Sequence, residues 1–483
     1  MISLIMNPPI KHGEKETMKK RERNGDTTSA KWALRALMMP LAVYATAACD
    51  TSVTNPGPVQ DAFLDSLNAH SAIVNGAKRD FSRALDQLAY WSAAMTYEIN
   101  PAGSTGSFGI PTYIQDGRFD INISNDWNRT SRARFVAEDA LRRFEEVLPL
   151  IDGAPSFDSY GPAAEAALLA GYANRAFGEN FCQVVFDGGP AQPHTDALAR
   201  AEGYFTQAIS IANGAGEADL ATAAQAGRAS VRAGLATYGL ANWTDAASDA
   251  SAVPNDFSHV IGYSNAEQAQ GNYVMVASPG TGTYRAHTQW GTYYEDYYRT
   301  TSDPRVPWVS NANLPFGDAA VTKFGGNVIF YPQDKYDNPA APINLSTGWE
   351  MRLIEAEAAL QAGGAGADAA AALMNQRLTD LGLATIPAGQ TVADVYTALK
   401  GQRMLELWIE ARRMFDLRRW EDNNVSGGIS DVLDGIYGTS TANVAGVGDE
   451  TPVGVLDQTL TTLATNERCW PIGRSEYNTN TNL

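Results

Sequence analysis

The sequence is poor in cysteine, histidine and positive charge, and each shortage excludes a class of protein. Three cysteines cannot build a disulfide-rich scaffold, and five scattered histidines form no pair at the helical i, i+4 spacing of a metal site. Lys and Arg number 36 against 54 acidic residues, and the resulting net charge of −18 argues against a nucleic-acid partner. No uncharged apolar run reaches the roughly 18 residues of a membrane helix. A hydrophobic content of 44% nevertheless supports a sizeable globular core.

Catalytic motifs are missing as well. The sequence contains no Gly-x4-Gly-Lys-Ser/Thr phosphate loop and no Gly-x-Ser-x-Gly nucleophile elbow, and Gly280-Thr-Gly282 lacks the third glycine of a dinucleotide site. Carboxylate pairs at glycosidase separation arise by chance among so many acids, so the sequence singles out none. We therefore predict a protein that is not an enzyme and that uses no metal or other cofactor.

Residues 1–48 have the pattern of a secretory signal peptide. Six basic residues within 19–35 precede an uncharged, mostly apolar stretch at 36–48. Met18, which stands directly before Lys-Lys-Arg, is an alternative start. The pattern predicts export of the rest of the chain.

Cys49 follows two alanines, and this arrangement resembles a bacterial lipobox, in which the cysteine thiol is lipidated. Thr46 departs from the leucine usual at its position. The alternative is an ordinary cleavage site beside a coincidental cysteine. Cleavage before Cys49 would leave a mature chain with 28 Lys and Arg residues against 50 acidic ones. Because this acidic surface would repel anionic lipid headgroups, the protein would be held at the membrane by its acyl chains. Residues 49–58 have no periodicity and predict a lipidated tether.

Helical periodicity dominates residues 59–254, which we expect to form an N-terminal helical part. Apolar residues recur at spacings of three and four in 59–75 and 77–98. The stretch 163–254 resembles diverged tetratricopeptide helix pairs, in which small residues allow close helix approach. The positions that carry this pattern are Ala201, Phe205, Ala208, Gly234, Trp243 and Ala246.

A further pair fits 348–362 and 367–382, and a single helix fits 392–420. These lie in a C-terminal part, 348–483, with a loop-rich tail. Residues 255–347 are instead rich in aromatics, Pro, Gly and Asn, with short strands expected at 274–276 and 328–331. The sequence thus predicts a mainly α, tetratricopeptide-like helical-repeat scaffold of about four helix pairs. It carries a large irregular, loop-rich insertion with short strands, where ligand binding is expected.

Aromatic residues mixed with polar ones form two candidate ligand-binding groups. Flat rings stack on the C–H faces of a sugar, while guanidinium and amide groups bind its hydroxyls. The alternative to ligand binding is that these aromatic rings only pack in the hydrophobic core. The first group consists of Arg285, Trp290, Tyr293, Tyr294 and Trp308, and the second of Tyr97, Asn100 and Tyr113.

Cys182 and Cys469 remain once Cys49 is lipidated. Export places them in a compartment that permits disulfides. The sequence leaves two alternatives open, a disulfide between them or two free cysteines.

Residues 403–420 resemble the signature of the SusD/RagB family, Arg-x-x-Glu-Leu-x-x-Glu-Gly-x-Arg-x-x-Asp-Leu-x-Arg-Trp. Gln402 replaces the usual acid and Ala411 the usual glycine. The matching positions are Glu406, Glu410, Arg413, Asp416, Arg419 and Trp420. On one helix, Glu406, Glu410 and Arg413 would form a ladder of charges, buried because large apolar residues surround it. We interpret these residues as structural.

Other segments carry the same resemblance. Residues 342–360 look like the family's strand-to-helix segment, and Asp303-Pro-Arg305 matches a recurrent family tripeptide. Residues 470–483 resemble the family's C-terminal ending, with Gly473 and Thr481 where prolines are usual.

The resemblance implies a surface-exposed lipoprotein of the outer membrane that captures nutrients, most often oligosaccharides. Such a protein acts as a hinged lid on its partner, a SusC-like TonB-dependent transporter. The alternatives are a peptide-binding member of this family, a membrane-anchored tetratricopeptide scaffold for protein partners, and a glycoside hydrolase.

Overall fold

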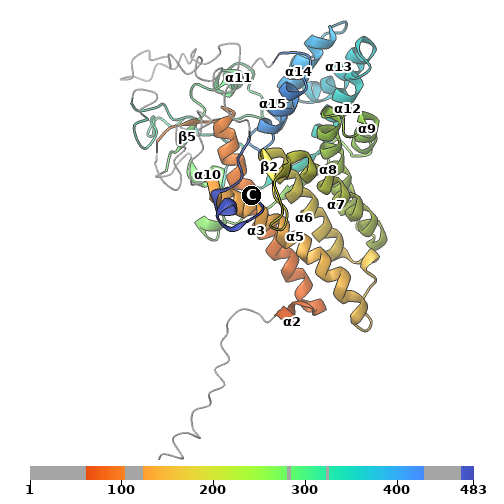
Figure 1. Ribbon diagram of the computed structural model, residues 1–483. Coiled ribbons are helices and arrows are strands. Elements are labelled where there is room, and N and C mark those ends of the chain that lie inside the picture. The colour runs from red at the N-terminus through yellow and green to blue at the C-terminus, as the bar shows by residue number, and fades with distance from the viewer. Residues whose placement is uncertain (1–60, 104–122, 280–283, 322–325, 429–468) are drawn as a thin grey trace, which may run out of the picture. The chain divides into compact units, whose positions relative to one another are not determined.

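The computed structural model describes residues 61–103, 123–279, 284–321, 326–428 and 469–483, all within one contact unit, Asp61–Leu483 (Figure 1). The predicted signal peptide, Cys49 and the tether lie outside the described residues. In the part of the chain that the structure describes, no helix is both long and apolar enough to cross a membrane.

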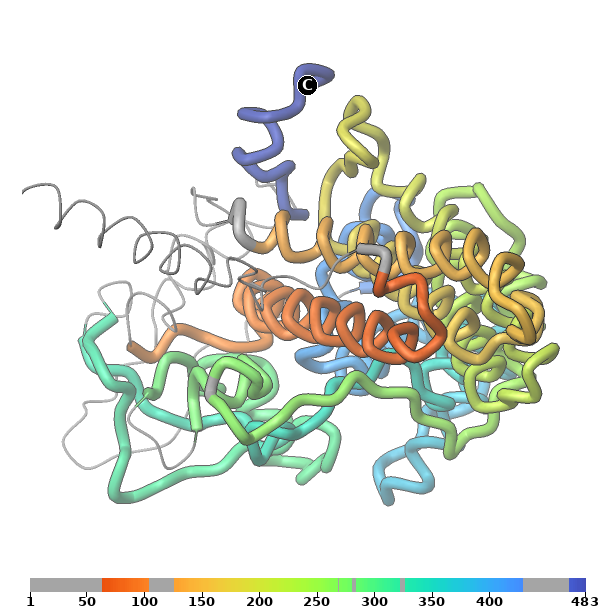
Figure 2. Tube along the Cα trace, turned by 90° about the horizontal axis from the view of Figure 1, so that it is seen from below, coloured from red at the N-terminus to blue at the C-terminus, as the bar shows by residue number. Residues whose placement is uncertain are grey.

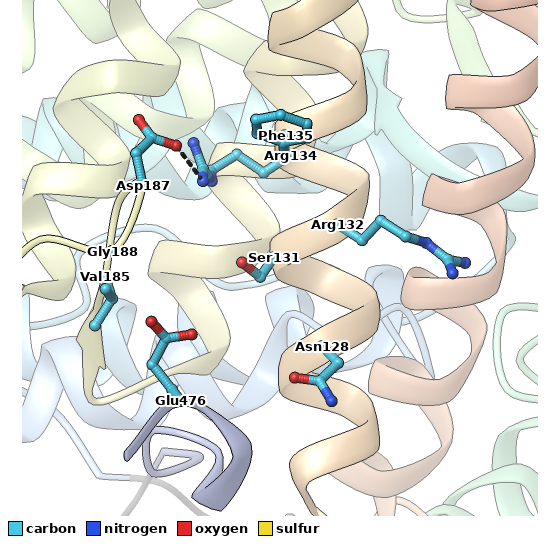
Figure 3. A pocket seen from close by; sticks show the side chains of 9 residues that line it. All are labelled: Asn128, Ser131, Arg132, Arg134, Phe135, Val185, Asp187, Gly188 and Glu476. Atoms are coloured by element: carbon cyan, nitrogen blue, oxygen red, sulfur yellow. Dashed lines mark hydrogen bonds and ion pairs between the residues drawn. The ribbon is translucent and has the colours of Figure 1, made fainter. Parts of the chain in front are cut away.

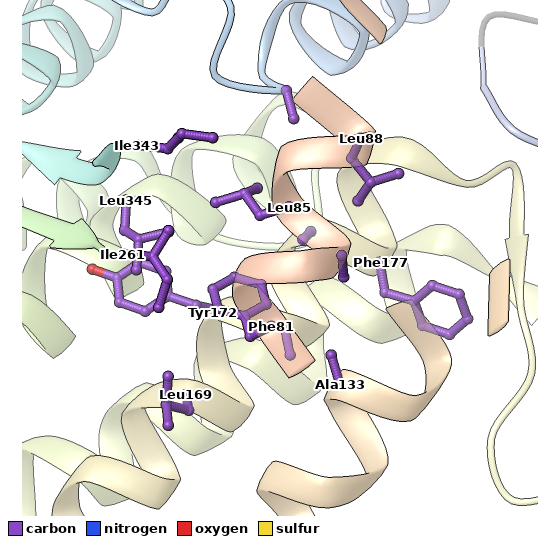
Figure 4. Close-up of a cluster of buried hydrophobic side chains, with 14 of the residues drawn as sticks. Phe81, Leu85, Leu88, Ala133, Leu169, Tyr172, Phe177, Ile261, Ile343 and Leu345 are labelled. Atoms are coloured by element: carbon purple, nitrogen blue, oxygen red, sulfur yellow. The ribbon is translucent and has the colours of Figure 1, made fainter. Parts of the chain in front are cut away.

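A long helix, α3, forms the centre of the N-terminal part. After the short α2 (Asp61–Leu64), α3 (Leu67–Met95) packs against α5 (Ile123–Val147). Phe81, Leu85 and Leu88 of α3 are buried in the main core, as their spacing predicts (Figure 4). The structure continues α3 through the break expected between 59–75 and 77–98. Packing along the whole helix outweighs the cost of about 1 kcal/mol for the glycine in between.

The predicted helix pairs follow one another in a stack. They are α6 (Gly161–Asn180), α7 (His194–Ala215), α8 (Ala218–Thr237), α9 (Trp243–Ser251), α12 (Gly348–Leu360), α13 (Gly364–Asp380) and α14 (Val392–Glu406). Each of α6 to α9 packs on the next, α9 packs on α12 across the insertion, and α12 packs on both α13 and α14. The expected mainly α, helical-repeat fold with a loop-rich insertion is confirmed.

Glycines at the helix contacts let this stack close tightly. The fully buried ring of Phe205 on α7 lies between Gly171 of α6 and Gly227 of α8. A Cβ atom would come within 2.6 Å of the ring at Gly171 and within 2.5 Å at Gly227. The aromatic residue of the predicted repeat pattern therefore fills a gap that only glycine leaves open.

The insertion leaves the stack after α9 and returns to it at α12. Its elements are β4 (Ser258–Ile261), η3 (Gln268–Gln270), α10 (Tyr273–Ala277), β5 (His287–Thr288), α11 (Tyr293–Thr301) and β6 (Ile343–Thr347). Antiparallel pairing of β4 with β6 joins its two ends. Figure 2 shows α3 between the insertion and α5. Hydrogen bonds connect the insertion to α3, including one of 3.0 Å from the Tyr263 hydroxyl to the Ser82 carbonyl.

Two short strands were predicted wrongly. Residues 274–276 belong to the helix α10, because the Asn272 side chain accepts a hydrogen bond from the Val274 N–H and caps the helix. Residues 328–331 contain no strand, only an isolated bridge between Ile329 and Phe316. A short buried apolar run has no periodicity that separates helix, strand and packed loop.

The signature segment does not form the single helix expected over 392–420. α14 ends at Glu406 and α15 (Arg413–Asp422) begins at Arg413. Between them Ile409 and Ala411 have φ angles of 56° and 60°, a left-handed backbone that interrupts a right-handed helix. Glycine adopts this backbone most readily, which accounts for the glycine usual at the position of Ala411.

The predicted charge ladder is therefore wrong, and the signature side chains pair with other elements instead. Glu406 accepts hydrogen bonds from Arg377 and Arg305, and Glu410 from Lys335 and Asn344. Asp416 binds Arg403 and Arg419, while Glu357 binds Arg419 and Trp420. The charge of Arg413 opposes the rise that burial causes in the pKa of Glu98. The signature thus joins distant parts of the chain.

A disulfide joins Cys182 to Cys469, between the end of α6 and the C-terminal segment. Beyond it, α18 (Arg474–Thr479) packs against α5. A Cβ atom at Gly473 would lie 2.6 Å from that of Trp127. This close approach gives a physical reason for glycine where the family ending usually has proline.

Gly227→Ala is expected to destabilise the protein, because the added methyl group would overlap the Phe205 ring. A cost of roughly 1–3 kcal/mol in the free energy of unfolding should appear in urea denaturation. The matched control is Gly203→Ala on α7, where nothing lies within 4 Å, and this change should stabilise the helix by roughly 0.5–1 kcal/mol. Equal effects of the two changes would contradict the packing described.

Asp86 of α3 is a buried carboxyl beneath the insertion. Its Oδ2 atom accepts a hydrogen bond of 3.2 Å from the Tyr273 N–H and lies 3.4 Å from Arg83. Burial raises the pKa of Asp86 to about 7, although Arg83 acts in the opposite direction. Between roughly pH 4 and pH 7 the folded chain keeps a proton that the unfolded chain releases. The free energy of unfolding contributed by this group therefore falls as pH rises through that window.

Asp86→Asn should accordingly stabilise the protein more at pH 8 than at pH 5, because asparagine can still accept the Tyr273 hydrogen bond without carrying a charge. Urea denaturation at both pH values measures the difference. Asp80→Asn, on the same helix but partly exposed, is the control. Equal stabilisation at both pH values would refute the pKa assignment.

Candidate ligand-binding site

The two aromatic groups predicted from the sequence come together in the structure. β1 (Asn100–Pro101) pairs antiparallel with β5, with Asn100 opposite Thr288. The Asn100 side chain donates a hydrogen bond of 2.9 Å to the Trp290 carbonyl, and the Ala102 N–H donates one of 2.8 Å to the Ala286 carbonyl. No sequence signal predicts this pairing, because strands of two residues have no detectable periodicity.

Several of the predicted residues lie in the interior. Tyr294 is 1% exposed and stacks on Trp408 at 5.4 Å between ring centroids. Tyr97 and Asn100 are also 1% exposed, and Trp290 is 6% exposed within a local apolar cluster that Trp308 packs against. These side chains can affect a ligand chiefly through the neighbours that they position.

Two other predicted residues have different outcomes. Arg285 supports the loop at 316–318, since its Nε donates to the Phe316 carbonyl at 2.8 Å and its backbone N–H to Asp318 at 3.0 Å. Tyr113 lies outside the described residues.

The partly exposed rings of α11 and the following loop form what we call the aromatic surface: Tyr293, Tyr297, Tyr298 and Trp308. Tyr293 and Tyr297 stack at 5.4 Å with an angle of 19° between ring planes. Trp308 meets Tyr298 edge-on at 5.8 Å. Aromatic side chains thus cover two neighbouring sides of a single short helix.

Buried polar contacts fix the orientation of this helix. The Thr292 side chain caps α11 by accepting from the Glu295 N–H, and Glu295 accepts from Gly291 N–H at 2.7 Å. Glu295 also holds Arg299 at 2.6 Å, which places the guanidinium carbon 5.0 Å from the centre of the Trp308 ring. The tryptophan is therefore held by a cation–π contact.

Sequence reasoning missed Tyr331, whose ring stacks on Trp308 at 4.5 Å. The sequence assigned this residue to a strand, and its position gave no indication of the contact. Glu295 was missed for the same reason, because a buried acid inside an aromatic run has no motif of its own.

Asp303 and Arg305 connect the aromatic surface to the signature segment. The Tyr297 hydroxyl donates to Asp303 at 3.0 Å, and Arg305 donates to Asp303 at 2.7 Å and to Glu406 at 3.2 Å. Burial favours the neutral acid, but hydrogen bonds and the charge of Arg305 outweigh it and lower the pKa of Asp303. The carboxylate therefore stays charged and keeps its hold on the tyrosine.

Burial raises the pKa of Tyr293 and of Tyr297 to about 12. Both hydroxyls therefore remain protonated at neutral pH, so the Tyr293 hydroxyl can donate as well as accept, while that of Tyr297 donates to Asp303 and can still accept. The aromatic surface offers ring faces and neutral hydroxyls next to one arginine. This chemistry suits an uncharged, hydroxyl-bearing ligand.

Comparisons with known proteins agree with this architecture. Residues 285–483 match the family model of the SusD family. A SusD superfamily protein from Bacteroides thetaiotaomicron has a TM-score of 0.58 at 12% identity, over 86% of this chain and 97% of that one. A SusD homolog from the same organism has a TM-score of 0.58 at 14% identity, over 86% and 96% of the two chains.

A SusD-like carbohydrate binding protein from Bacteroides vulgatus has a TM-score of 0.53 at 15% identity, over 73% of this chain and 83% of that one. At such identities these structures establish a shared fold. No curated protein matches the sequence.

The fold defines a helical-repeat protein that carries a large loop-rich insertion. Its C-terminal part, residues 285–483, matches the SusD family model, and its fold is shared with SusD-like structures.

Proposed function

We propose that this protein is a noncatalytic, lipid-anchored receptor of the outer-membrane surface that binds an oligosaccharide at its aromatic surface. The observation that carries the proposal is the pairing of partly exposed, mutually packed rings with a buried polar framework. Rings fixed in this way lose little conformational entropy when a ligand stacks on them.

The polar groups around the rings support a sugar as ligand. Tyrosine hydroxyls and the half-exposed Arg299 lie beside the ring faces, and both kinds of group can bind sugar hydroxyls. A carbohydrate presents flat C–H faces and a dense rim of hydroxyls, so it can use both features at once.

Delivery to a SusC-like TonB-dependent transporter completes the proposal. The match of residues 285–483 to the SusD family model supports a hinged lid that closes over ligand held between the two proteins. A stable lid contact needs roughly 1,000 Å² of buried surface, which a chain of this size can supply. Cys49 would attach the receptor to the membrane, with 49–58 as tether, because the acidic mature chain has no electrostatic attraction to lipid.

Trp308→Ala and Tyr293→Ala should each weaken oligosaccharide binding by roughly 3- to 10-fold, as expected for the loss of one stacking ring. Affinity electrophoresis in gels that contain neutral polysaccharides measures the change. Trp308→Phe, which keeps a ring, should retain most of the binding.

Phe63→Ala is the control for loss of an aromatic side chain, because Phe63 is 59% exposed on α2, away from α11 in Figure 1. Thermal unfolding verifies that each variant is folded. If both alanine variants were retarded like the parent in every gel that retards it, the aromatic surface would not be the binding site.

Cys49→Ala should abolish incorporation of radiolabelled palmitate and release the protein from the membrane fraction, since a single polar tether provides no other anchor. Cys182→Ala is the control, and it should still incorporate palmitate. A Cys49→Ala protein that remains labelled and membrane-bound would contradict the anchoring proposal.

A further inference from the structure

A pocket lies on the opposite side of α3 from the insertion, where α5, the turn after β2 (Gln183–Val184) and α18 meet (Figures 2 and 3). Its volume is about 560 Å³, within the range of small-ligand sites. Its lining comes from three distant parts of the sequence: residues 128–135 of α5, 185–188 of the turn, and Glu476 of α18. The disulfide at Cys469 and the contact of Gly473 with Trp127 hold α18 in place.

The two arginines of this lining are balanced by two acids, and both arginines are already paired. Arg134, with a side chain only 2% exposed, binds Glu138 at 2.6 Å and Asp187 at 3.1 Å. Arg132 turns toward α3, where it binds Asp80 at 2.7 Å (Figure 3). An anionic ligand would meet arginines that are already neutralised and carboxylates that repel it. A cationic ligand would be repelled by the same two arginines. The lining therefore favours an uncharged ligand.

The remaining side chains combine one exposed ring with hydrogen-bonding groups. Phe135 is 53% exposed among the lining residues, so its ring is available for contact with a ligand. Figure 3 shows Ser131 between Asp187 and Glu476, with Asn128 beside them. Glu476 accepts hydrogen bonds from Trp127 and Asn480, which fix its carboxylate without using all of its acceptor capacity.

Arg134 adds a buried polar atom to the pocket wall. Within the described residues, its Nε has no hydrogen-bond partner, although both terminal nitrogens are bonded. The Nε atom is itself enclosed by protein, so Arg134 contributes to the pocket wall through its ion pairs with Glu138 and Asp187.

We infer that this pocket is a second carbohydrate site, which binds one uncharged sugar residue with its C–H face on Phe135 and its hydroxyls on Glu476, Ser131 and Asn128. This inference is independent of the aromatic surface, because the two sites share no residue and lie on opposite sides of α3. A receptor with two separated sugar sites would hold a long polysaccharide more strongly than a short oligosaccharide, through effective concentration.

Affinity electrophoresis of the mature protein tests the inference, with gels that contain xyloglucan, mixed-linkage β-glucan, galactomannan, starch or the anionic polygalacturonate. Phe135→Ala and Glu476→Gln are made in the parent and in the Trp308→Ala background. In that background, each change is expected to reduce the remaining retardation by an uncharged polysaccharide, with a roughly 3- to 10-fold weaker apparent Kd. Phe63→Ala provides the matched phenylalanine control, and thermal unfolding verifies folding.

The outcomes separate this inference from the proposed function. Retardation that depends on Phe135 and Glu476 but not on Trp308 supports the pocket and contradicts the aromatic surface. Retardation that depends on Trp308 alone overturns the pocket and leaves the proposed function standing. The absence of any Phe135-dependent retardation by uncharged polysaccharides, or such dependence with polygalacturonate alone, overturns the inference.

Discussion

The structure depends on burying charged side chains that pair across distant parts of the chain. Arg412, 6% exposed, binds Glu179 of α6 at 3.0 Å and Glu350 of α12 at 2.8 Å. Burial opposes ionisation, yet the nearby charge of Arg412 lowers the pKa of Glu350. Removing one partner from such a set leaves an uncompensated buried charge, which typically costs 3–5 kcal/mol. The ion pairs of Arg412 with Glu179 and Glu350 therefore hold the break between α14 and α15 in place. They do so although the positive φ angles of Ile409 and Ala411 are strained.

The same constraint extends to the candidate binding site. Lys335 of the insertion donates to the Trp408 carbonyl and to Glu410, and Arg305 donates to Glu406. Arg305 also holds Asp303, which in turn binds the Tyr297 hydroxyl. A ring of the aromatic surface is thus connected through two ion pairs to the signature segment. This chain of contacts gives a loop-rich region the rigidity that ligand stacking requires.

Sequence reasoning predicted the parts of this structure that have a local cause. The helix pairs follow from apolar spacing, and the tight contact at Phe205 follows from an aromatic residue in a pattern of small ones. The family signature was recognisable although its secondary structure was not, because side-chain spacing alone does not show the left-handed residues at 409 and 411. Likewise, composition identified the aromatic segment, but only the pairing of Asn100 with Thr288 determines which rings become buried. Tyr293 and Tyr294 are adjacent on one helix, yet the first is partly exposed and the second is buried. The sequence does not predict this difference, because it arises from the stacking of Tyr294 on the distant Trp408.

Separation of scaffold and insertion explains how one fold can accept different ligands. α9 packs directly on α12, and β4 pairs with β6, so the insertion enters and leaves the stack at one place without interrupting it. Lengthening a loop closed in this way, or changing its sequence, costs little conformational entropy. The entropic cost of closing a loop grows only with the logarithm of its length. Most residues of the main hydrophobic core lie on helices of the scaffold, whereas the rings of the aromatic surface are only partly buried. Structures only 12–16% identical to this chain can therefore share its fold while their loops diverge.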